Sequence, residues 1–86
     1  MEVKPKFKTR EPTTEERARI ENNFTYHTPT GDQPARYSFL RNIFKQTASV
    51  VCRICPQSRE LSLALTALEE AMMWANASIA RNEDGH

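Results

Sequence analysis

The sequence predicts an all-α protein: a short N-terminal helix, then a long antiparallel helical hairpin that assembles with copies of itself. Three observations predict this class. Residues 33–55 and 58–80 carry apolar residues at helical spacing. About three residues connect these two segments, which forces the helices to pack antiparallel. Both segments are apolar on more than one face, and one hairpin cannot cover that much surface.

Composition sets the outer limits. The chain has 86 residues, enough for one domain, and 12 basic residues against 11 acidic ones give a net charge of +1. This balance disfavours a nonspecific DNA binder. The sequence contains no apolar run long enough to span a membrane and begins with no secretory signal. Two cysteines cannot form a disulfide scaffold, so the reducing cytoplasm is the expected compartment.

The N-terminal part divides into an arm and a short helix. Residues 1–12 contain two prolines and alternate lysines, which predicts a flexible arm, either solvated or lying on a partner subunit. Thr13 and Glu16 have the spacing of a capping box. The helix that they start is expected to end near Asn22, as a surface or capping helix.

A loop with aromatic side chains follows over residues 23–33. It contains Phe24, Tyr26 and His27, and loops on rigid scaffolds are where binding residues concentrate. Asp32 is predicted to cap the next helix.

The two long helices each carry an apolar seam. On the first, with a break at Thr47, the seam comprises Tyr37, Leu40, Phe44, Val51 and Ile54. On the second, which Ser58 caps, it is unbroken and comprises Leu61, Leu65, Leu68, Met72, Ala75 and Ile79. Second stripes lie beside these seams: Phe39, Ile43 and Val50, and Leu63, Ala67 and Trp74. We therefore expect an obligate oligomer with ligand sites between subunits; the alternative is a hairpin module that docks on another protein.

Few residues of the sequence have the type and spacing of a binding, metal or catalytic site. Arg41 and Lys45 share one helix face, which suits either phosphate binding beside the aromatic loop or a plain solvated face. Cys52 and Cys55 form a CxxC pair, for which buried structural cysteines are favoured over zinc or redox chemistry. Asn76 stands on a mostly apolar face, where a buried amide needs a partner in another subunit or a ligand. No catalytic constellation is recognisable, so the sequence predicts a protein that is not an enzyme.

The sequence also resembles a known family. Residues 20–27, the segment Gln33-Pro34-Ala35-Arg36-Tyr37, and the runs over 56–64 and 68–82 are similar to the phage anti-CBASS cyclic-oligonucleotide sponges. The same hairpin domain occurs in anti-Thoeris cyclic-ADP-ribose sponges. The resemblance covers residues 20–83.

The resemblance implies a hexameric bundle that sequesters cyclic nucleotide messengers, without cleaving them and without a cofactor or metal, in the cytoplasm of the infected bacterial host. It implies a sponge domain over residues 13–83, followed by a tail at 84–86. Cyclic dinucleotides would bind between paired subunits at Tyr26 and Arg41, with Lys45 nearby on the same helix face. Cyclic trinucleotides would bind at separate three-fold junctions, at a second set of residues: His27, Thr28 and Arg81. Cyclic ADP-ribose isomers are the alternative ligands.

Overall fold

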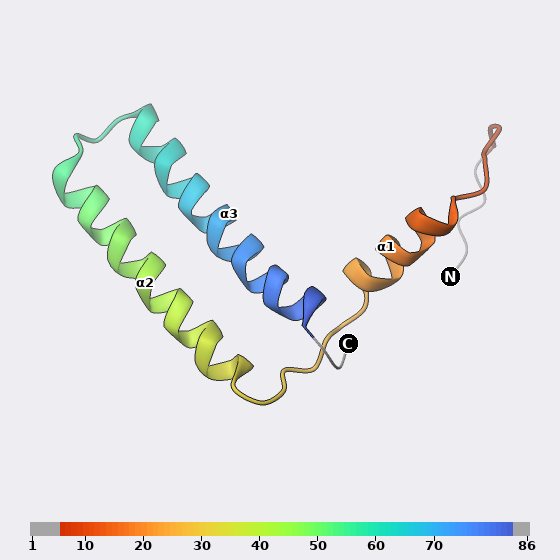
Figure 1. Cartoon of the computed structure of the whole chain (residues 1–86). Helices are drawn as coiled ribbons and strands as arrows, with labels where there is room; N and C mark the ends of the chain where they lie inside the picture. Colours follow the sequence, from red (N-terminus) through yellow and green to blue (C-terminus); the bar gives the residue numbers. More distant parts are fainter. Residues whose placement is uncertain (1–5, 84–86) are drawn as a thin grey trace.

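The computed structural model describes residues 6–83, and these form three helices and no strand (Figure 1). Helix α1 spans Thr14–Phe24, α2 spans Gln33–Ile54 and α3 spans Arg59–Asn82. The predicted all-α class is therefore confirmed. Residues 1–5 of the expected arm and the expected tail at 84–86 lie outside the described residues.

Helices α2 and α3 form the antiparallel hairpin (Figure 1). They contain 22 and 24 residues, so each is roughly 33–36 Å long. Residues 55–58 connect them, and the Ser58 hydroxyl accepts a hydrogen bond of 3.1 Å from the Leu61 backbone N–H, which starts α3 as predicted. The N-terminal end of α2 therefore lies beside the C-terminal end of α3.

The seam between these helices agrees with the prediction except at one end. All six predicted positions on α3 are half-buried. On α2, Ala48 continues the seam where Thr47 interrupts the apolar spacing. The prediction was wrong at Ile54, which is 76% exposed because it is the last residue of α2, at the tip of the hairpin.

Helix α1 is fixed locally at its start. The Glu16 carboxylate accepts hydrogen bonds from the Thr13 backbone N–H at 2.9 Å and from the Arg10 guanidinium at 2.8 and 2.9 Å. The Thr13 hydroxyl accepts from the Glu16 N–H at 3.1 Å, which completes the predicted capping box. The helix runs two residues past the expected end at Asn22.

A single chain encloses no apolar core among its described residues. Its radius of gyration is 18.3 Å, whereas a compact domain of this length has about 12 Å. Its accessible surface is 7571 Å², against roughly 5,200 Å² for a folded monomer of this mass. The second stripes are exposed as predicted, including Phe39 at 65% and Trp74 at 66%. One chain leaves much of its apolar surface in water.

Two further expectations were wrong. Cys52 and Cys55 are both exposed, because they lie at the tip of the hairpin, off the seam, with Cys55 already beyond α2. Asp32 precedes α2, but its carboxylate makes no cap bond and instead accepts from Arg36 Nε at 3.1 Å.

No helix within residues 6–83 is long and apolar enough to cross a membrane.

Candidate ligand-binding site

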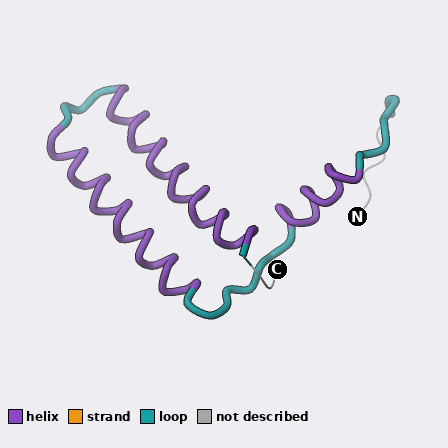
Figure 2. The backbone as a smooth tube through the Cα atoms, in the orientation of Figure 1, coloured by secondary structure: helices purple, strands orange, loops and turns teal. Residues whose placement is uncertain are grey.

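The aromatic loop passes beneath the C-terminal end of α3 and is tied to it (Figure 2). Asn22 Nδ2 donates to the Arg81 carbonyl at 3.1 Å, and Arg81 Nη2 donates to the Asn23 carbonyl at 3.5 Å. His27 Nε2 lies 2.7 Å from the Asn22 carbonyl, so this nitrogen carries the proton and donates it. These bonds fix both the start of the loop and the His27 ring.

Gln33, which is only 3% exposed, holds the far end of the loop. Its Oε1 accepts from the Thr30 N–H at 3.0 Å, and its Nε2 donates to Glu83 Oε1 at 2.7 Å. The Glu83 carboxylate also accepts two bonds of 2.6 Å from the Arg36 guanidinium. These bonds, made by the charged acceptor Glu83, raise the pKa of Arg36 above its ordinary value. Hydrogen bonds and an ion pair therefore join the two helices at the open end of the hairpin, beyond the end of the apolar seam.

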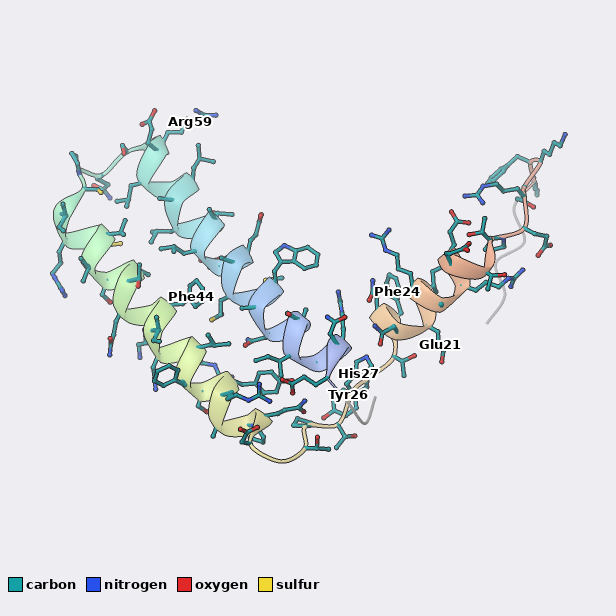
Figure 3. All side chains as sticks on the ribbon, viewed as in Figure 1. Glu21, Phe24, Tyr26, His27, Phe44 and Arg59 are labelled. Carbon is teal, nitrogen blue, oxygen red and sulfur yellow. The ribbon has the colours of Figure 1, made fainter. Side chains whose placement is uncertain are left out.

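A shallow hollow of about 410 Å³ lies over this junction. Its walls come from the loop, the first turns of α2 and the last turns of α3. Figure 3 shows Tyr26 and His27 at this end of the hairpin, far from Arg59 at the start of α3. The lining residues are Asn23, Thr25, Tyr26, His27, Tyr37, Arg41, Asn76, Ala77, Ala80 and Arg81. The fold thus gathers four of the six predicted site residues around one hollow.

The hollow suits a flat anion. Arg41 and Arg81 bring two guanidinium groups, and none of its lining residues within 6–83 has a carboxylate. The Tyr26 ring is 79% exposed and is available for stacking. Guanidinium groups fork onto phosphate oxygens, and aromatic rings stack on bases, so this arrangement can bind a phosphorylated nucleotide.

One of three comparisons with known proteins gave a match. Residues 16–80 match the sequence model of a family described as "Acb2/Tad1, hairpin domain". The chain belongs to this family. The comparison with curated proteins and the comparison with solved structures gave no match.

The Acb2/Tad1 hairpin match covers most of the residues that build the hollow. Tyr26, His27 and Arg41 lie inside it, whereas Arg81 and Glu83 follow directly after it. Of the residues that line the hollow, Arg81 alone lies outside the family match.

Two predicted residues do not line this hollow. Thr28 is exposed on the loop and is not among the residues that line the hollow. Lys45 lies one helical turn after Arg41 and lines a different hollow of about 290 Å³ between α2 and α3, beside Glu69 and the half-buried Phe44. The resemblance implies separate pockets for the two residue sets, yet His27 and Arg81 share one hollow with Tyr26 and Arg41 within a single chain.

A second hollow of about 660 Å³ lies between α1 and α3. Phe24, Trp74 and Arg19 line it, and Arg81 stands between the two hollows, because it lines both. The Phe24 ring is 85% exposed and belongs to this second hollow rather than to the first.

Sequence reasoning missed the residues that shape the site. Gln33 and Glu83 are 50 residues apart and nothing in the local pattern pairs them. The one available signal was Arg36, a cation in a segment with few acids. Tyr37 was assigned to the seam alone, although it also lines the hollow.

Proposed function

We propose that this protein is a phage-encoded sponge that binds cyclic nucleotide messengers without cleaving them and so blocks CBASS-type signalling in the cytoplasm of the infected bacterium. The observation that carries the proposal is the hollow itself, where Tyr26, Arg41 and Arg81 meet in a chain of the Acb2/Tad1 hairpin family. Binding without cleavage is what the resemblance to the sponges implies, and recovery of the intact ligand tests it.

We further propose that copies of the chain assemble into a hexamer. Self-association is supported by the roughly 2,400 Å² of surface that a single chain has in excess of a compact monomer of its mass. The number six comes from the family resemblance. Stable interfaces bury surfaces of this order, and the exposed stripes on α2 and α3 offer apolar side chains for such an interface.

Assembly would also complete the ligand site. A hollow of this shallowness leaves most of a bound ligand in solvent, whereas tight sites enclose their ligands. Across a two-fold axis each chain contributes one Tyr26 and one Arg41, which gives two stacking rings and two cations. A cyclic dinucleotide has two bases and two phosphates with the same approximate symmetry. Cyclic trinucleotides and cyclic ADP-ribose isomers are the further ligands that the proposal includes.

Calorimetric titration of the purified protein against cyclic di- and trinucleotides and cyclic ADP-ribose isomers tests this function. Sub-micromolar binding of at least one cyclic nucleotide, with intact ligand recovered after heat denaturation, is expected. Tyr26→Ala and Arg41→Ala should each weaken that binding at least tenfold. Their matched controls are Phe24→Ala, an exposed aromatic of the second hollow, and Arg59→Ala, a cation at the far end of the hairpin.

Binding of no ligand in the panel would reject the sponge. The second candidate, a hairpin module that docks on another protein, is favoured by the exposed apolar stripes alone. It predicts a protein that binds none of these nucleotides and associates with a different chain. A monodisperse homo-oligomer in light scattering contradicts that alternative.

A further inference from the structure

Asn76 is an exception among the polar side chains of α3. Its Oδ1 is buried and is the one such side-chain atom of the described residues without a hydrogen-bond partner. Asn82, on the same helix, donates from its Nδ2 to the Ser78 carbonyl at 3.0 Å, so its amide is already engaged. Leaving a buried acceptor unpaired costs about 1–3 kcal/mol, which the protein recovers only when a donor arrives.

The position of Asn76 says where that donor comes from. The residue lines the same hollow as Tyr26 and Arg41. Its neighbours in that wall, Ala77 and Ala80, have side chains of a single carbon, so a flat ring can approach the helix closely at this point. No hydrogen bond within residues 6–83 engages Oδ1, so turning this oxygen toward a ligand in the hollow breaks no hydrogen bond.

We propose that Asn76 reads the base of the bound cyclic nucleotide and selects adenine; this inference rests on the proposed sponge function. An asparagine amide has an acceptor and a donor side by side. Adenine presents the complementary pair, with the N6 amino group as donor and N7 as acceptor, and this pairing is bidentate. The guanine edge that carries N7 presents two acceptors, N7 and O6, and cannot satisfy Oδ1.

Different residues of the site then recognise different parts of the ligand. Tyr26 stacks on any base, because every base has a π-face, and Arg41 binds any phosphate. Neither contact distinguishes adenine from guanine. Asn76 adds the base-edge contact that does, from a rigid helix rather than from the loop.

Titration of the full-length protein with cyclic di-AMP and cyclic di-GMP tests the inference. The wild type should prefer cyclic di-AMP. Asn76→Ala should weaken cyclic di-AMP about tenfold or more and cyclic di-GMP less than threefold, with an unchanged oligomer mass, since alanine favours the helix. Asn76→Asp replaces the amide donor by a second acceptor, which can no longer donate to adenine N7, so cyclic di-AMP should again weaken about tenfold or more. Asn82→Ala is the matched control and should change neither affinity.

Three results would overturn the assignment: equal losses for both ligands in Asn76→Ala, no loss for either, or an altered oligomer mass, which would place the partner of Asn76 in another subunit. These results leave the sponge function standing, provided that the wild type binds. A wild type that binds neither these two ligands nor the rest of the panel rejects the sponge function and this inference with it.

Discussion

Arg36 and Glu83 join the first turn of α2 to the end of α3 through two hydrogen bonds of 2.6 Å between the guanidinium and the carboxylate. The same carboxylate accepts from Gln33, the most buried residue described. Because Gln33 also accepts from the Thr30 N–H, this junction holds both the open end of the hairpin and the far end of the aromatic loop.

Replacing Glu83 tests the importance of this junction. Glu83→Gln removes the charge that attracts both Arg36 and the Gln33 amide, and the protein should lose about 1 kcal/mol of stability, because the pair is partly exposed and water screens it. Thermal unfolding at fixed protein concentration measures this. The matched control is Glu11→Gln, whose carboxylate is 91% exposed in its pair with Arg17 and should contribute little. Equal melting temperatures for the two variants would contradict a structural role for Glu83.

The pH dependence of α1 follows from Glu16. Hydrogen bonds from Arg10, and then from the Thr13 backbone N–H, lower the pKa of Glu16 to about 2 from an ordinary value of 4.5. A carboxyl with a lowered pKa stabilises the folded state fully above the unfolded pKa, and this contribution disappears as pH falls from about 4.5 through 2. The start of α1 should therefore stay ordered at pH 4 and loosen between pH 4 and 2.

Carbon-detected NMR titration of the Glu16 carboxyl measures that pKa directly. Arg10→Ala removes the largest cause of the shift and should move the midpoint back toward 4.5. A Glu16 midpoint that Arg10→Ala does not move would mean that the arm does not fold back on α1 in solution.

Local signals in the sequence predicted what is local in the fold. The capping box at Thr13 and Glu16 and the seam on α3 depend on neighbours three or four residues apart, and both are present. The Arg36–Glu83 pair spans 47 residues, and its geometry exists only once the hairpin has closed.

The errors have the same origin. Residue type suggested burial for Cys52 and Cys55, and seam spacing suggested it for Ile54, but all three lie at the tip of the hairpin and are exposed. The hollow was only partly predictable: Tyr26, Arg41, Asn76 and Arg81 were visible in the sequence as single residues, whereas their meeting around one hollow depends on the closed hairpin.

Self-association should depend on the second stripes. Leu63 is 52% exposed on α3 and lies off the seam. If assembly covers this stripe, Leu63→Glu buries a carboxylate without a partner and should lower the oligomer mass in light scattering. Thr66→Glu, three residues along the same helix at an exposed polar position, is the matched control and should leave the mass unchanged. If both variants keep the oligomer mass of the wild type, the stripe is not an interface.

Ligand binding should weaken with salt, because the hollow has two guanidinium groups and none of its described lining residues carries a carboxylate. The Debye length falls from about 10 Å at 0.1 M to about 3 Å at 1 M, so charge attraction to phosphates is screened over this range. Tyr26→Ala should lower affinity at every salt concentration and keep the slope of log affinity against log salt, since stacking carries no charge. Arg41→Ala should lower affinity and flatten that slope to about half, because one of two cations is lost. Calorimetry at four salt concentrations separates the two effects, and an unchanged slope in Arg41→Ala would place the phosphates elsewhere in the site.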